Sequence, residues 1–213
     1  PNIADWPALK RMPEQVLLKL CSVLDDPVTT TDELIPSGET STLRSNPYKL
    51  SRFTLSRKDP EYVLRADEVA KIENGNEKKA LFDNLNRIDG INIDDCVFGS
   101  AIYANMPGDG SAREQAASCQ KVLGGWGNIA IEYATKRYRS NLINWGILPL
   151  LCDEKVKEKF ACGDYIFLPD VKNTLIKGES TVKAYLIKEN ADKAEEITLG
   201  IVQMTKDERD ILL

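Results

Sequence analysis

Short apolar runs alternate with helix-forming segments in the middle of the chain, and glycines separate them. The apolar runs expected to be strands are residues 96–103, 128–131 and 147–152. The segments expected to be helices are residues 112–123 and 134–144, followed by Gly124-Gly125 and Gly146 at the expected helix ends. Because this order is typical of a sheet covered by helices, it predicts a mixed α/β domain.

The flanking parts of the chain show the same two kinds of pattern. Residues 16–23 favour a strand, and residues 60–85 have helical spacing of apolar side chains with a break at Gly75. Further strands are expected at residues 164–168, 181–187 and 196–202, before a short charged C-terminal helix. Residues 1–13 are punctuated by proline and lack an initiator Met. We therefore expect a linker from a longer protein over residues 1–15 and one domain over residues 16–213.

The chain contains no histidine among its 213 residues. Histidine-containing zinc sites, Ser-His-Asp triads and two-histidine iron centres are therefore excluded. The five cysteines show no CxxC pair, which indicates free thiols, a reducing cytoplasmic environment and no metal held by this chain alone. No apolar run is long enough to span a bilayer. The net charge of −5 argues against nucleic-acid binding through bulk electrostatics.

The best candidate site is the segment GDGSARE, residues 108–114, between an expected strand and an expected helix. Its glycines permit close approach of a ligand to the backbone, and the start of a helix favours an anion. Arg113 adds a planar fork suited to a carboxylate. A purely structural interpretation stays open, because Ser111 followed by Glu114 also has the spacing of a capping box.

Three blocks of sequence resemble the aconitase family. Residues 108–117, GDGSAREQAA, are similar to the family's glycine-rich loop followed by Ser-Ser-Arg-Glu and a helix of small residues. Downstream, Ser140-Asn141-Leu142 and the segment GILPL at residues 146–150 are similar to the family's Asn-Leu-x-x-x-Gly-x-Leu-Pro-Leu. Upstream, Thr30-Thr31-Asp32 and Arg44 have the spacing of the family's Thr-Thr-Asp and arginine loop.

The resemblance is to the C-terminal swivelling domain of aconitases, which is a separate small subunit in isopropylmalate dehydratases. It implies a swivelling β/β/α domain with a small mixed sheet or barrel flanked by helices. It also implies a hydro-lyase that reversibly dehydrates a hydroxy di- or tricarboxylate at a four-iron, four-sulfur cluster. In the family the cluster is bound by other domains or by a large subunit, so the isolated chain is expected to be inactive.

The resemblance also assigns roles to individual residues. Ser111 corresponds to the serine base, and Arg113 and Arg44 correspond to arginines that bind substrate carboxylates. The backbone of Gly110 and Ala112 belongs to the same binding loop, and Asp32 corresponds to the acidic residue that orients a histidine of the cluster-bearing part.

Two departures from the family pattern leave the substrate open. Ala112 replaces the second serine of Ser-Ser-Arg, and Glu33 replaces the histidine that follows the aspartate in aconitases. The alternatives are a non-catalytic module that binds carboxylates or RNA on the same fold, and a free-standing small subunit of the isopropylmalate dehydratase type.

Other charged and thiol side chains are interpreted as structural. The basic run Lys136, Arg137 and Arg139 is expected to be a solvated helix face, and Arg57, Lys58 and Arg65 are expected to solubilise a loop. The cysteines are expected to be buried small apolar residues, with Cys119 as a redox-sensitive neighbour of Ser111.

Overall fold

The centre of the molecule is a closed barrel of mixed parallel and antiparallel strands, seen in a computed structural model that describes residues 10–85, 90–189 and 193–213. The strand order around the barrel is β1-β3-β5-β6-β9-β8-β7. The strands are β1 (Gln15–Leu24), β3 (Cys96–Ala104), β5 (Gly125–Ala130), β6 (Leu148–Leu151), β7 (Tyr165–Leu168), β8 (Thr181–Ile187) and β9 (Ala194–Ile201). This is the mixed α/β architecture that the sequence predicts.

The barrel has a parallel half and an antiparallel half. Neighbours among β1, β3, β5 and β6 are parallel, whereas β7, β8 and β9 pair antiparallel with each other and with the adjoining strands. Parallel strands need crossover connections, which α5 (Arg113–Val122) and α6 (Lys136–Asn144) provide. The carboxyl ends of the parallel strands therefore meet at one end of the barrel.

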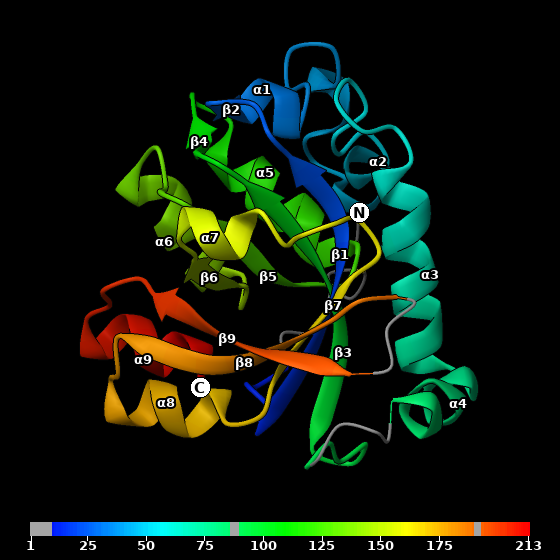
Figure 1. The fold of residues 1–213 in the computed structure, drawn as a ribbon. Coiled ribbons are helices and arrows are strands. Elements are labelled where there is room, and N and C mark those ends of the chain that lie inside the picture. The colour runs from blue at the N-terminus through cyan, green and yellow to red at the C-terminus, as the bar shows by residue number, and fades with distance from the viewer. Residues whose placement is uncertain (1–9, 86–89, 190–192) are drawn as a thin grey trace.

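Helices cover the barrel on several sides (Figure 1). The helices α3 (Tyr62–Asn74) and α4 (Glu77–Asn84) flank β3 and are divided at Gly75, as the sequence predicts. Three further helices are α7 (Glu154–Lys157), α8 (Val171–Lys177) and α9 (Lys206–Leu212), the last two beside the C-terminus in Figure 1. The helices α7 and α8 were not expected from the sequence, whereas α9 is the predicted C-terminal helix.

Strand β1 is buried on both faces and contributes to two apolar clusters. Leu17 and Cys21 pack in one cluster with residues of α3 to α6, while Val16, Leu18 and Leu20 pack in a second one with residues of the other barrel strands. Alternation of side chains along a strand produces this division. A strand covered on both sides has a nearly continuous apolar sequence, which explains why this strand could be predicted from composition.

Several short elements gather at one end of the barrel, at the top of Figure 1. They are β2 (Thr29–Thr30), α1 (Thr31–Leu34), the 3-10 turn η2 (Ser41–Leu43), α2 (Pro47–Ser51) and β4 (Pro107–Asp109). Strand β2 pairs in parallel with β4, so segments almost eighty residues apart lie side by side. The sequence pattern predicted loops here, because elements this short carry no usable periodicity.

The start of the described chain packs against the domain. Met12 is buried, and its backbone N–H donates to the carbonyl of Leu212. The predicted linker over residues 1–15 falls largely outside the described residues, which begin at Lys10. None of the helices in the described part of the chain has the length and apolar character needed to cross a membrane.

Lys121, in the last turn of α5, is an almost fully buried cation. Its side chain lies over the ring of Trp126, with Nζ 3.8 Å from the ring centroid, and donates to the carbonyl of Gly146 at 3.0 Å. Burial lowers the pKa of Lys121 to about 7, and the charge of Lys10 adds to this effect. In the unfolded chain the ammonium keeps its ordinary high pKa.

This shift predicts how stability depends on pH. Between about pH 7 and pH 10 the unfolded chain keeps the Lys121 proton that the folded chain has released, so stability rises with pH in this window. The free energy of unfolding should increase by about 1–2 kcal/mol from pH 7 to pH 8.5 in the wild type, and less in Lys121→Met. Urea unfolding at both pH values measures this. If the free energy of unfolding changed equally with pH in the wild type and in Lys121→Met, the lowered pKa of Lys121 would be contradicted.

Candidate functional site

The glycine-rich loop that precedes α5 is shaped by two close approaches. Gly108 has a φ of +98°, and a Cβ at this position would lie 2.3 Å from the ring of Tyr138. Gly110 has a φ of +130°, and a Cβ there would lie 2.2 Å from Oγ1 of Thr31. Both positions therefore require glycine for backbone conformation and for space. The loop is held between α6 on one side and the start of α1 on the other.

Thr31 connects the first part of the chain to this loop. Its Oγ1 accepts a hydrogen bond from the backbone N–H of Ala112 at 3.2 Å. The pairing of β2 with β4 brings Thr31 into position, because Thr30 lies opposite Asp109 in the register. The structure thus brings together two of the three blocks that carry the family resemblance.

Ser111 does not cap the helix that follows it. The N-cap residue of α5 is Ala112, and it makes no side-chain capping bond. The carboxylate of Glu114, which a capping box would use, instead accepts hydrogen bonds from Asn141 Nδ2 and from Trp145 Nε1, the latter at 2.5 Å. The capping-box interpretation of Ser111 is therefore wrong. The Ser111 side chain is exposed, and no hydrogen bond joins its hydroxyl to another of the described residues.

Ser111 and Arg113 line an open pocket of about 420 Å³ between α5 and α6. Arg113 donates from its guanidinium to the carbonyl of Gly110, which folds the side chain back over the loop. The other lining residues are Glu114 on α5 and, on α6, Lys136, Arg137, Ser140 and Asn141. The pocket joins the predicted base and the predicted carboxylate-binding arginine in one concave surface.

Lys136 and Arg137 on α6 line the candidate site, although the sequence did not predict them as site residues. Lys136 and Arg137 were interpreted, together with Arg139, as one solvated face; both are exposed as that interpretation expects, whereas Arg139 is partly buried. Lys136 and Arg137 line the Ser111 pocket, whereas the guanidinium of Arg139 lies 3.7 Å from Glu208 with only 19% of its side chain exposed. The sequence contained one signal for their position. Thr135 is a good N-cap residue, and its side chain caps α6, which places Lys136 and Arg137 in the first turn of this helix.

A buried polar network fixes α6 against α5 and β5. The hydroxyl of Tyr138 accepts from Gln120 Nε2 at 2.8 Å, and Asn128 Nδ2 donates to Gln120 Oε1 at 3.1 Å. All three side chains are buried. The Oδ1 atom of Asn128 is buried without a hydrogen-bond partner among the described residues, but the bonds to Gln120 join α5 to α6 and β5 and so hold the two helices that flank the pocket in a fixed relation.

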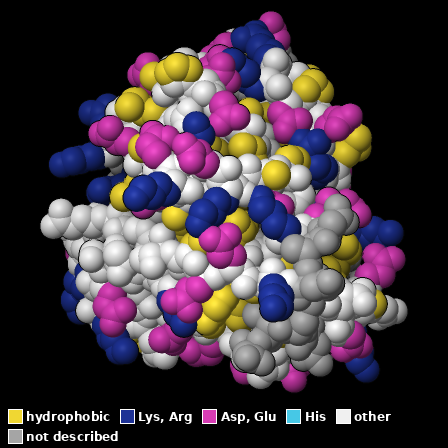
Figure 2. Space-filling model, viewed as in Figure 1, with side chains coloured by type: hydrophobic (Ala, Val, Ile, Leu, Met, Phe, Trp, Pro, Cys, Tyr) yellow, Lys and Arg dark blue, Asp and Glu magenta, His cyan; other side chains and the backbone are white. Residues whose placement is uncertain are grey.

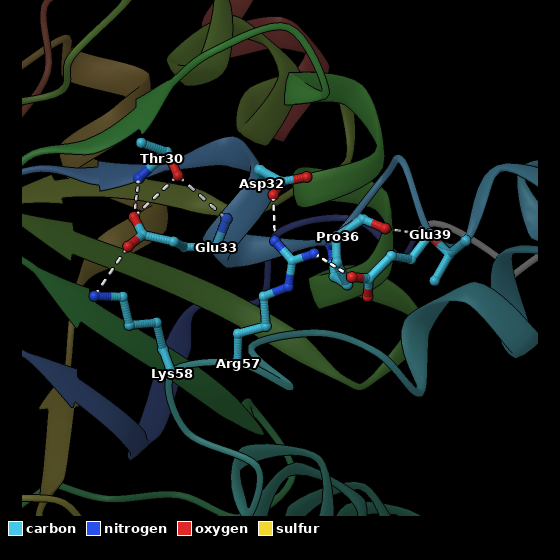
Figure 3. Close-up of polar contacts among 8 residues, drawn as sticks. Thr30, Asp32, Glu33, Pro36, Glu39, Arg57 and Lys58 are labelled. Carbon is cyan, nitrogen blue, oxygen red and sulfur yellow. Dashed lines mark hydrogen bonds and ion pairs between the residues drawn. The ribbon is translucent and has the colours of Figure 1, made fainter.

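Asp32, the predicted partner-orienting residue, lies in an ion-pair network at the start of α1 (Figure 3). Arg57 bridges two acidic residues, with Nη1 2.5 Å from Asp32 and Nη2 2.6 Å from Glu39. Beside them Lys58 pairs with Glu33 at 2.9 Å, and Glu33 also accepts from the backbone N–H of Thr30. These cations were expected only to solubilise a loop, but they hold the loop to α1.

Hydrogen bonding also sets the ionisation of Glu33. Burial alone raises the pKa of this carboxyl group, but the backbone N–H of Thr30 and the ammonium of Lys58 outweigh it. The pKa of Glu33 therefore lies below its usual value. Thr30 and Glu33 form a true capping box, which holds α1 beside the glycine-rich loop.

Arg44, predicted as a second carboxylate-binding arginine, lies in the exposed turn that follows η2. Its guanidinium donates to the carbonyl of Ser37 at 3.3 Å. No contact among the described residues joins it to the Ser111 pocket. Its role in binding stays a prediction.

The cysteines do not form a metal site within the described residues, where no grouping of three or more Cys, Asp and Glu side chains is suited to a metal. Four of the five thiols are buried, and only Cys162 is exposed. Burial raises the pKa of Cys119 to about 12, which argues against a redox role for this thiol beside Ser111. Within the described residues the thiols are therefore not grouped as the ligands of an iron-sulfur cluster would be.

Comparison with known proteins identifies the architecture. Residues 58–155 match the family described as the aconitase C-terminal domain. The solved structure of a 3-isopropylmalate dehydratase from Methanocaldococcus jannaschii is similar, with a TM-score of 0.53 and 23% sequence identity over 94% of this chain and 88% of that chain. The fold is the aconitase-type swivel domain. No curated protein sequence matches the chain.

The match to the aconitase C-terminal domain covers only part of the candidate site. Ser111 and Arg113 lie inside the matched segment, as do the two cations of α6. Asp32 and Arg44 lie before it, although the structural likeness extends over most of the chain. The resemblance noted in the sequence is confirmed for the swivel-domain fold.

A substitution at Gly110 tests the geometry of the loop. In Gly110→Ala the new methyl group must displace Thr31, and the left-handed backbone conformation becomes strained. We expect a loss of about 1–3 kcal/mol in the free energy of unfolding. Gly38→Ala is the matched control, because nothing lies within 4 Å of a Cβ at that position. Urea unfolding of both variants measures the difference, and equal stability would show that the loop geometry is wrong.

Proposed function

We propose that this chain is the swivel domain of a hydro-lyase and that Ser111 is its catalytic base. The observation that supports the proposal is the free Ser111 hydroxyl beside Arg113 at the start of α5, within an aconitase-type fold. The substrate class is a hydroxy di- or tricarboxylate. In the reaction the base removes a proton from the carbon next to a carboxylate, and the hydroxyl group leaves from the neighbouring carbon.

Arg113 would hold the carboxylate next to the proton that is removed. Its guanidinium lines the same pocket as Ser111, two positions along the chain. A guanidinium binds a carboxylate in a bidentate manner and withdraws charge as the carbanion develops. Binding and activation of the C–H bond would thus occur at adjacent side chains of one loop.

A serine hydroxyl is a weak base unless its alkoxide form is stabilised. Ser111 precedes Ala112, the N-cap residue of α5, and this helix of ten residues carries partial positive charge at its N-terminus. The cation of Arg113 favours the alkoxide further, since an opposite charge nearby lowers the pKa of an acidic group. Both effects become stronger when water is excluded from the pocket.

The partner would be a cluster-bearing part, either other domains of the same protein or a large subunit. The Ser111 pocket is open to solvent in this chain, so a partner surface is needed to cover it. The cluster would supply Lewis-acid coordination of the leaving hydroxyl. Asp32 is exposed near the loop and would orient a residue of the partner, and Arg44 would contribute a second carboxylate contact.

Replacement of Ser111 tests the assignment of the base. In the complete enzyme Ser111→Ala should lower kcat by a factor of about 100 or more with little change in KM, because only the proton transfer is affected. Ser180→Ala, an exposed serine between α8 and β8, is the matched control and should keep wild-type kinetics. An unchanged kcat in Ser111→Ala would rule out the role of base.

The second candidate function is a non-catalytic module that binds carboxylates or RNA. Ala112 supports it, because the hydroxyl of the family's second serine is missing at this position. Against RNA, Figure 2 shows basic and acidic side chains interspersed on the face in view, so the drawn residues form no continuous basic surface there. Salt-dependent RNA affinity of the cluster-free protein would favour the module, whereas iron-dependent turnover would favour the enzyme.

A further inference from the structure

We propose that Lys136 and Arg137 on α6 form a second carboxylate subsite beside Arg113, so that this chain holds a polycarboxylate at two points. The inference deepens the proposed function and rests on it. It assigns a role in substrate specificity to a pair of residues that the family resemblance leaves without one. The inference also predicts that this chain itself, through Lys136 and Arg137, binds a second carboxylate group of the ligand.

Three cations and one carboxylate line the Ser111 pocket, so the charges of its described residues are not balanced. Arg113, Lys136 and Arg137 line the pocket, and no ion pair joins any of them to another of the described residues. The one carboxylate in the lining, Glu114, accepts hydrogen bonds from Asn141 and Trp145. Positive charge is therefore in excess where the ligand would lie.

This arrangement differs from the other cation-rich part of the chain. Arg57 pairs with two acidic residues, and Lys58 also pairs with two. Arg65 pairs with Asp59 and Glu61. The cations at residues 57–65, which have a structural role, are thus each paired with carboxylates of the protein. The cations of the pocket have no ion pair with the described residues, which leaves them available to an external anion.

The position of the α6 cations within their helix strengthens the argument. Lys136 and Arg137 follow the N-cap residue Thr135, and the first turn of α6 contains no acidic residue. Cations are disfavoured at a helix N-terminus because the helix dipole is positive there. The fold therefore places two cations at an unfavourable position, and a bound anion would relieve the repulsion from the dipole and between the cations.

The relative placement of the two subsites is fixed by the scaffold. Thr135 Oγ1 donates to the carbonyl of Gly108 at 3.2 Å, and the ring of Tyr138 packs on the same glycine. The start of α6 is thus attached to the loop that carries Ser111. A volume of about 420 Å³ lies within the range of small-molecule sites. The pocket can hold a compact polycarboxylate in such a way that the C–H bond next to one of the ligand's carboxylates faces Ser111.

Ligand binding by the 213-residue chain tests this inference without turnover. The probe is tricarballylate (propane-1,2,3-tricarboxylate), titrated up to about 20 mM, a concentration that largely fills a site with a Kd of about 1 mM. NMR of backbone amides at Ser111 to Glu114 and calorimetry give the affinity. The test variant is Lys136→Met/Arg137→Met. The control is Lys79→Met/Lys155→Met, which removes two exposed lysines of α4 and α7.

We expect the α6 variant to bind tricarballylate about tenfold more weakly than the wild type, and the control to bind within about twofold. Equal affinity of the two variants would overturn the inference, as would the absence of any amide shift with the wild type at 20 mM. Tighter binding of inorganic phosphate, or loss of RNA binding alone in the α6 variant, would also overturn it, because the site would then serve another anion. Urea unfolding confirms that both variants remain folded.

The outcome can be separated from that of the proposed function. If tricarballylate binding weakens in the α6 variant but Ser111→Ala keeps full turnover, the carboxylate subsite is retained and the role of Ser111 as base is refuted. A large loss of kcat in Ser111→Ala, together with unchanged tricarballylate binding in the α6 variant, would retain the base and refute the subsite.

Discussion

The packing of Tyr138 against Gly108 is the contact on which the candidate site depends. The ring occupies the space that a side chain at residue 108 would take, and the hydroxyl accepts from the buried amide of Gln120. One side chain therefore joins the glycine-rich loop, α5 and α6. Ser111 and Arg113 form one wall of the pocket, and the first turn of α6 forms the other. If this contact were lost, the two walls would no longer have a fixed spacing.

A second set of contacts attaches the first part of the chain to the same loop. Thr31 accepts from the backbone of Ala112, and the β2–β4 pair holds it there. The ion pairs of Arg57 and Lys58 keep α1 in place behind this contact. The candidate site is thus assembled from three separate stretches of sequence, which meet beyond the ends of the parallel strands.

Long periodic elements could be predicted from the sequence, and short ones could not. Strand β1 and helices α3, α5 and α6 lie within a few residues of their predicted bounds, because apolar spacing and glycine stops are local signals. Strands β2 and β4 are stabilised by each other across the chain, so neither has a signal of its own. The Thr30–Glu33 capping box was a readable signal for α1 that was overlooked.

The same distinction applies to the site. Ser111 and Arg113 could be proposed because their segment resembles a family motif, and the structure places them in one pocket. The participation of Lys136 and Arg137 depends on how α6 packs against Gly108, which charge counting along the chain does not reveal. Glu114 has the sequence spacing of a capping box with Ser111, but Ala112 is the N-cap of α5, and the Glu114 carboxylate accepts hydrogen bonds from Asn141 and Trp145 instead.

The most direct test of the account is solvent exchange of the proton that Ser111 is proposed to remove. The complete enzyme is incubated in water with a substrate deuterated on the carbon next to the carboxylate, and loss of deuterium is followed by mass spectrometry. The account predicts rapid loss with the wild type and no loss above background with Ser111→Ala, while polycarboxylate binding persists. Equal deuterium loss in the two proteins would contradict the role of Ser111 as the base.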